Sequence, residues 1–303
     1  MKVHSGELMK KLRAEAGLSQ EEMAEKLFIS VRQLRRYESG EGEINLWTFL
    51  QFCEILGMPT EEWWIFYFNT EEDKHYRMSK QIKRLVRDED YKAAEELLAV
   101  FEKSPLSTAL NVQQFIIETK VKINPSLPPQ EAIETLTKAI QMSNSKFDES
   151  KVAEYRLTYN EINILISLAG KYSKMGDLDR AIALTKAIIA GREASNTTEE
   201  DRGHVFPALM SNLSTMLGKA GRYEESLEVS EQGIKICRKY GRLNHISVLL
   251  YNTACSLQAL GEEEHVYKVL LVRAYNFAFA IGDFKGGNII KKDAENSFGI
   301  LLD

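Results

Sequence analysis

The sequence predicts an all-α protein, with a five-helix N-terminal domain followed by an array of helix pairs. Three observations support this fold class. The 303 residues include only 6 prolines and 18 glycines, so long stretches are free to be helical. Apolar residues recur at helical spacing between side chains that cap helices. A motif that begins with glycine then recurs three times in the second half of the chain.

The five N-terminal helices are expected within residues 1–68. Each begins with a residue type that opens or caps a helix, and glycines separate several of them. The expected starts are residue 6, Ser19, Ser30, Asn45 and Thr60. Glu22 lies three residues after Ser19, which completes a capping box.

The third of these helices carries polar side chains that suit DNA. Arg32, Gln33, Arg35 and Arg36 fall within five positions, whereas Leu34 belongs to the buried side. A short basic helix displayed on a small scaffold is suited to enter a DNA major groove. A solvated charged face is the alternative, and we rank it lower because the capping pattern around the helix is consistent throughout.

The net charge of the chain, −5 at pH 7, is unfavourable for DNA binding when taken as a whole. Residues 1–36, however, hold eight Lys or Arg against five Glu, while residues 37–68 add six Glu and no base. The positive charge is therefore local. Salt-driven affinity of a monomer for DNA should be modest, and a dimer that doubles the contacts is expected.

Other function classes find no support in the sequence. Three cysteines (Cys53, Cys237 and Cys255) lie in apolar patterns without disulfide or zinc spacing, so they are expected to be reduced core thiols. No phosphate-binding loop, dinucleotide motif or His-Glu-x-x-His is present. With neither a signal peptide nor a long apolar run, we expect a cytoplasmic protein without membrane segments, metal, cofactor or enzymatic activity.

The N-terminal pattern resembles the Xre/Cro-type helix-turn-helix family. The resemblance rests on the order of five short helices and on the spacing of Gln20, Ala24, Leu34, Glu38 and Gly40. One departure is Phe28, where the family usually has glycine between the second and third helices. That position often needs a positive φ, which is costly for a bulky residue, so either the turn differs or strain is accepted.

This resemblance implies DNA contacts at seven positions. They are Gln20, Ser30, Val31, Arg32, Gln33, Arg35 and Arg36. Gln20, Arg35 and the helix N-terminus at Ser30 are assigned to phosphates. The other four positions are expected to meet base edges, and Arg32 and Arg36 are the preferred guanine readers.

The same resemblance implies a buried ion pair between the first and third helices. Arg13 and Glu38 match a pair that the family usually forms. Loss of Arg13 would leave the Glu38 carboxylate unpaired. We therefore expect this pair to support the fold.

The remainder of the chain is predicted to be a linker at residues 69–77 and a repeat domain at residues 78–303. Turns are expected at Gly176, Gly221 and Gly261. Small residues stand seven positions before each glycine, at Ala169, Ser214 and Ala254. A small residue at a helix crossing followed by such a turn resembles the tetratricopeptide repeat, which implies a right-handed superhelix of about five pairs. Residues 281–303 are the expected capping helix.

The spacing of the repeats is longer than the standard one. The aligned positions are 38, 49, 45 and 40 residues apart, at Ala94, Ala132, Ala181, Ser226 and Val266. The standard repeat has 34 residues. We therefore expect lengthened helices or loops.

Tetratricopeptide arrays curve, and the first helix of each pair lines a concave groove that suits extended peptides. Asn212 and Asn252 both stand nine residues before a turn glycine. In that family an asparagine there often binds a peptide. Asn163, Tyr159 and Tyr251 are further groove candidates. These side chains could instead satisfy the backbones of neighbouring helices; that alternative has equal weight for Asn212 and Asn252 and is preferred for the other three.

The two parts together are similar to the Rgg/PlcR/PrgX group (RRNPP family) of peptide-responsive regulators of Gram-positive bacteria. The resemblance implies a homodimer that binds a double-stranded, palindromic DNA operator under the control of a short signalling peptide. One alternative is a transcriptional regulator whose repeat domain binds a protein partner. A more remote alternative is an adaptor whose helix-turn-helix binds protein.

Overall fold

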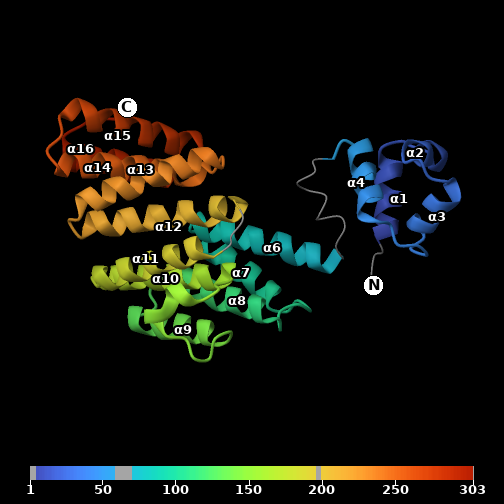
Figure 1. Ribbon diagram of the computed structural model, residues 1–303, viewed down its shortest axis with the longest axis horizontal. Coiled ribbons are helices and arrows are strands. Elements are labelled where there is room, and N and C mark those ends of the chain that lie inside the picture. Colours follow the sequence, from blue (N-terminus) through green and yellow to red (C-terminus); the bar gives the residue numbers. More distant parts are fainter. Residues whose placement is uncertain (1–4, 59–69, 196–198, 303) are drawn as a thin grey trace. The chain divides into compact units, whose positions relative to one another are not determined.

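The computed structural model describes residues 5–58, 70–195 and 199–302, and within these segments it contains helices and no strand (Figure 1). The predicted all-α class is therefore confirmed. The chain divides into two compact units, Met1–Val112 and Gln113–Asp303. The first unit contains the N-terminal helices and one helix pair, and the second contains most of the repeat array.

Four N-terminal helices are described. They are α1 (Ser5–Glu15), α2 (Gln20–Lys26), α3 (Val31–Glu38) and α4 (Leu46–Ile55). The side chains of Ser19, Ser30 and Asn45 each accept a hydrogen bond from the backbone N–H three residues on, which confirms the predicted caps. The fifth helix expected between residues 60 and 68 lies outside the described residues.

The buried side of helix α3 is held in place by close packing. Leu34 is fully buried in a core that also contains Met9, Met23 and Phe49. Helix α1 approaches the end of α3 so closely that a Cβ on Gly6 would lie 2.0 Å from the Tyr37 carbonyl oxygen. Glycine at this position therefore allows the two backbones to meet.

The turn between α2 and α3 keeps its hydrogen bonds although it contains a bulky residue. Phe28 has a φ of 55°, and its side chain is 90% exposed. The Phe28 N–H donates to the Glu25 carbonyl at 3.1 Å, and the Ile29 N–H donates to the Ala24 carbonyl at 3.0 Å. Of the two possibilities raised by the sequence, the chain accepts the strained left-handed conformation.

Arg13 and Glu38 form a buried ion pair between α1 and α3. Arg13 Nε lies 2.6 Å from Glu38 Oε1, and Nη2 lies 3.0 Å from Oε2. The two residues are 8% and 4% exposed. Donation to Glu38 is the main reason that the pKa of Arg13 is raised. Gln20 Nε2 also donates to Glu38 Oε2 at 2.7 Å, so α2 is tied to the same carboxylate.

A helix pair follows the N-terminal domain. It consists of α6 (Thr70–Arg87) and α7 (Tyr91–Phe101), which pack against each other. Residues 70–77, which the sequence suggested as a linker, are therefore helical. By composition this polar stretch resembles a loop.

The remaining helices continue the array. Their bounds are α8 (Leu110–Ile123), α9 (Pro129–Gln141), α10 (Tyr159–Lys174), α11 (Leu178–Ala194), α12 (Glu199–Lys219), α13 (Tyr223–Lys239), α14 (Ile246–Ala259), α15 (Glu264–Ala280) and α16 (Phe284–Phe298). From α9 onward each helix packs against the next, and α10, α12, α14 and α16 also contact one another in succession (Figure 1). This arrangement confirms the tetratricopeptide-like packing.

The predicted repeat markers have the expected structural roles. Gly176, Gly221 and Gly261 have φ values of 86°, 71° and 85°, which only glycine adopts without strain. The small residues Ala169, Ser214 and Ala254 are at most 1% exposed. Gly282, with φ 79°, marks one more turn of the same kind before α16, which the sequence analysis assigned only as a cap.

The longest repeat spacing has a local cause. Between α9 and α10 the chain forms a short 3₁₀ helix, η1 (Glu149–Glu154), which packs against α11. The next spacing is extended because α12 alone has 21 residues. A second 3₁₀ helix, η2 (Leu243–His245), precedes α14.

The left-handed turn yields a stability prediction. Phe28→Gly should raise the free energy of unfolding of the helix-turn-helix domain by about 0.5–1 kcal/mol, because glycine tolerates positive φ and the exposed ring loses no packing. Denaturant unfolding of the full chain measures the change. Phe28→Ala is the control, since it removes the ring but keeps the Cβ; an equal gain in both variants would assign the effect to the ring instead of the backbone.

The buried ion pair yields a second prediction. Arg13→Ala should destabilise the domain by about 3–5 kcal/mol, because the Glu38 carboxylate is left buried without its partner. Lys11→Ala is the matched control. Lys11 pairs with Glu15 on the exposed side of the same helix at 3.7 Å, and its loss should cost at most about 1 kcal/mol. Unchanged stability of Arg13→Ala would contradict the role assigned to the pair.

Candidate functional site

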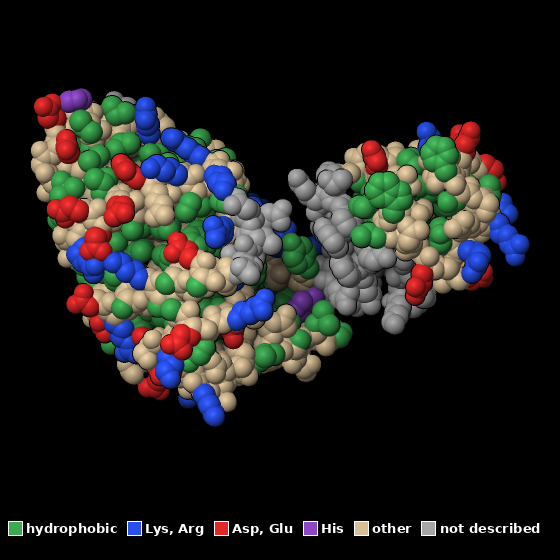
Figure 2. Space-filling view, viewed as in Figure 1, with side chains coloured by type: hydrophobic (Ala, Val, Ile, Leu, Met, Phe, Trp, Pro, Cys, Tyr) green, Lys and Arg blue, Asp and Glu red, His purple; other side chains and the backbone are tan. Residues whose placement is uncertain are grey.

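The outward face of α3 collects the polar side chains that the sequence singled out. Arg32, Gln33, Arg35 and Arg36 are all exposed. Ser30 Oγ accepts from the Gln33 backbone N–H at 3.1 Å, so the start of the helix is well defined. In Figure 2 basic side chains gather over α3 at the edge of this domain, with acidic side chains close by.

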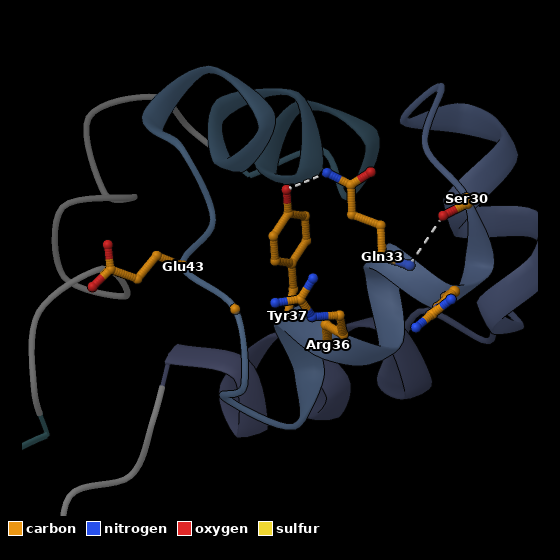
Figure 3. A pocket seen from close by; sticks show the side chains of 7 residues that line it. Ser30, Gln33, Arg36, Tyr37 and Glu43 are labelled. Atoms are coloured by element: carbon orange, nitrogen blue, oxygen red, sulfur yellow. Dashed lines mark hydrogen bonds between the residues drawn. The ribbon is translucent and has the colours of Figure 1, made fainter.

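An open pocket lies along this face (Figure 3). It is lined by Ser30, Arg32, Gln33, Arg36, Tyr37, Gly42 and Glu43. Within the described part of the chain, the guanidinium groups of Arg32 and Arg36 form no hydrogen bond or ion pair. Two charged donors are therefore available to a ligand at this surface.

Three of the other residues predicted to contact DNA already bond to or pack against residues of their own domain. Gln20 uses its amide nitrogen on Glu38, and its Oε1 accepts from Arg35 Nε at 3.0 Å. Arg35 also lies 3.5 Å from Glu21. Val31 is half-buried and packs against the helix-turn-helix core, so little of it faces outward.

In the array, Asn252 and Tyr251 bond to neighbouring helices. Asn252 Nδ2 donates to Ser214 Oγ at 2.7 Å and to Thr215 Oγ1 at 2.9 Å, both on α12. Tyr251 donates to Asp293 on α16, and burial raises the pKa of its hydroxyl. For both residues this geometry favours a contact between helices over peptide binding, although the partners are side chains and not the backbone groups considered above.

Asn212 and Asn163 have a different environment. Both are half-buried, and neither side-chain amide has a hydrogen-bond partner among the residues that the structure describes. Asn252 bonds to Ser214 and Thr215, which lie in the repeat before it. The corresponding residues for Asn212 are Ala169 and Gly170, which have no hydroxyl group to offer. Tyr159 is 45% exposed at the start of α10.

Tyr37, Gly42 and Glu43 line the pocket but were not predicted from the sequence. Tyr37 belongs to the pocket through its hydroxyl, which accepts from Gln33 Nε2 at 2.7 Å. The spacing of these two residues, one helical turn apart, was the available signal. Gly42 and Glu43 follow α3 in a loop and gave no signal that would place them beside it.

Two other kinds of site find no support in the described segments. There, no three or more His, Cys, Asp or Glu side chains gather in a way that could hold a metal ion. None of the helices in these segments combines the length and apolar character needed to cross a membrane.

Comparison with known proteins supports the assignment of the N-terminal domain. Residues 9–63 match the family model described as helix-turn-helix (HTH_3). No curated protein matches the chain in sequence.

Solved structures match the fold of nearly the whole chain. Bacillus thuringiensis PlcR, in complex with the peptide PapR7 and DNA, has 20% identity and a TM-score of 0.70, over 95% of this chain and 98% of PlcR. A variant of Rgg2 of Streptococcus dysgalactiae, a receptor for the SHP pheromone, has 17% identity and a TM-score of 0.60, over 96% of this chain and 98% of Rgg2.

ComR of S. thermophilus, in complex with DNA and its signalling peptide ComS, is similar as well. It has 17% identity and a TM-score of 0.56, over 98% of this chain and all of ComR. At such identities the similarity concerns the fold. The chain thus joins an N-terminal helix-turn-helix domain to tetratricopeptide-like repeats, and in fold it resembles the RRNPP regulators PlcR, Rgg2 and ComR.

Proposed function

We propose that this protein is a sequence-specific DNA-binding transcriptional regulator controlled by a short intracellular signalling peptide. The observation that carries the proposal is the pair of guanidinium groups of Arg32 and Arg36, which lie on the exposed face of α3 and bond to no residue in the described part of the chain. A helix-turn-helix domain presents this helix to the major groove. Arginine that donates two hydrogen bonds to guanine O6 and N7 is the commonest specific contact there.

The other residues predicted to contact DNA support the same assignment. Arg35 and Gln20 are linked to Glu38, so they would contact phosphates from a fixed position. Ser30 caps the N-terminus of α3, where backbone N–H groups favour an anion. Val31 would offer only an apolar contact at the edge of the helix.

A homodimer and a palindromic operator complete the DNA side of the proposal. Within residues 1–68 all eight Lys and Arg lie in residues 1–36, beside eleven Glu in the same 68 residues, so a single domain offers few phosphate contacts. Two copies would double them, and a palindrome would match their symmetry. The boundaries that we propose for these activities are residues 1–68 for DNA and 78–303 for the peptide and dimerisation, with the protein acting in the cytoplasm.

Peptide binding is assigned to the layer of first helices, around α10 and α12. Asn212 and Asn163 supply half-buried amides without partners in the described segments, and an amide can pair with both the N–H and the C=O of an extended chain. Tyr159 is exposed nearby in the sequence, at the start of α10. A peptide would act through different affinities for two arrangements of the DNA-binding domains.

The DNA proposal predicts the outcome of a binding selection. The full chain should enrich a sequence from randomised duplexes, and Arg32→Ala with Arg36→Ala should abolish that preference, at a cost of about 1–3 kcal/mol for each lost bidentate contact. Arg35→Ala is the control, because loss of a phosphate contact should weaken binding to all sequences alike. If the double variant enriched the same sequence as the unaltered chain, α3 would not be the reader and the adaptor alternative would gain.

The peptide proposal predicts saturable binding of a short peptide. Candidate peptides of fewer than about ten residues should raise the melting temperature of the chain or shift its affinity for the enriched duplex, because a ligand stabilises the state it binds. Asn212→Ala should weaken this binding by up to about tenfold, the value of one hydrogen bond of about 0.5–1.5 kcal/mol.

Asn276→Ala serves as the control for Asn212→Ala. Asn276 is exposed on α15, a second helix of its pair, so its loss should leave peptide affinity unchanged. Equal effects of both variants would contradict the assigned surface. Response to a protein partner, with no response to any peptide, would favour the alternative regulator.

A further inference from the structure

Gln33 differs from Arg32 and Arg36 on the exposed face of α3 because another side chain holds it. Its Nε2 donates to the Tyr37 hydroxyl at 2.7 Å, across one turn of the helix (Figure 3). Arg32 and Arg36, on either side of it in the sequence, have no such bond within the described segments. The amide therefore has a defined orientation before any ligand binds.

Tyr37 itself is fixed by the domain. The residue is 8% exposed and belongs to the helix-turn-helix core. The loop after α3 covers one side of its ring, since a Cβ on Gly42 would lie 3.5 Å from Tyr37 Cδ1 and 3.7 Å from Cε1. The Gly42 N–H donates to the Arg36 carbonyl at 3.0 Å, which holds that loop in place. The hydroxyl is thus a rigid acceptor.

The backbone of Gln33 is held as firmly. Its N–H donates to the Ser30 side chain at 3.1 Å, in the cap of α3. With both the backbone and the amide nitrogen bonded, the exposed side chain retains little freedom. Side chains that are ordered beforehand lose less entropy when they bind.

The groups that remain free on Gln33 match one base. A glutamine amide has two N–H donors and one carbonyl acceptor, and Tyr37 uses one donor. One donor and one acceptor are left. Adenine presents the complementary pair in the major groove, the N7 acceptor and the N6 donor, whereas guanine presents two acceptors that suit arginine.

We propose that Tyr37 is a positioning residue that holds Gln33 ready to read an adenine, so base preference at one operator position depends on a hydroxyl that does not touch DNA. The inference rests on the proposed DNA-binding function. It assigns the face of α3 two guanine readers, Arg32 and Arg36, with an adenine reader between them in the sequence. The variant Tyr37→Phe removes the hydroxyl alone and leaves the aromatic ring packed in the core.

Selection from randomised duplexes with the full chain tests the proposal. The unaltered chain should prefer adenine at one position of each half-site, and Gln33→Ala should remove that preference. Tyr37→Phe should lower it by roughly three- to tenfold, while the positions read by the arginines stay unchanged. Adding Tyr37→Phe to Gln33→Ala should change nothing further at that position, because the hydroxyl acts only through the amide.

The possible results separate this inference from the function on which it rests. If the unaltered chain enriches no sequence, the proposed DNA-binding function fails, and this inference with it. If it enriches a sequence but Gln33→Ala leaves every position unchanged, or Tyr37→Phe retains the full adenine preference, this inference alone is overturned.

A measurement on the unaltered chain tests the proposal even if the variant Tyr37→Phe does not fold. Nitrogen relaxation of side-chain amides should show the Gln33 amide, identified by the signal lost in Gln33→Ala, to be as rigid as the backbone of α3. A freely rotating Gln33 amide in the free protein would overturn the proposal.

Discussion

One buried charge pair holds the helix-turn-helix domain together. Arg13 and Glu38 give up most of their hydration, and their close bidentate contact, together with the bond from Arg13 Nη1 to the Leu18 carbonyl at 2.7 Å, offsets that loss. Gln20 bonds to the same carboxylate, and Arg35 bonds to Gln20, so the buried charge connects to the exposed face through two further hydrogen bonds. The surface that α3 presents therefore depends on α1 and α2 being in place.

In the array, hydrogen bonds from side chains stabilise the close contacts between helices that small residues allow. Ser226 Oγ donates to the Ser214 carbonyl at 2.9 Å, and Ser256 Oγ lies 3.0 Å from Ser226 Oγ. Serine is small enough for helices to approach, and its hydroxyl then bonds across the contact. Asn252 bonds to Ser214 as well, so this part of the array leaves no side-chain N–H of Asn252 for a ligand.

Much of the fold could be predicted because caps, turn glycines and small crossing residues are encoded by a few neighbours in sequence, as at Ser30 and Gly221. Hydrogen-bond partners on different helices are harder to predict, because they depend on residues that are far apart in the sequence. Asn212 and Asn252 occupy equivalent positions, but only Asn252 meets hydroxyls in the preceding repeat. The start of α6 was missed because residues 70–77 have the polar composition of a loop. The role of Tyr37 was not predicted, because the sequence does not show where the hydroxyl of an aromatic ring points.

The turn at Gly282 makes α16 the opening helix of a sixth pair. Among the described helices it packs chiefly on α14 and α15, and Phe284 and Ile289 remain 61% and 55% exposed. In a linear stack each interface between neighbouring helices adds stability, so a helix with few such interfaces is held weakly. Local opening should therefore involve α16 early, and covering those two apolar side chains would slow it.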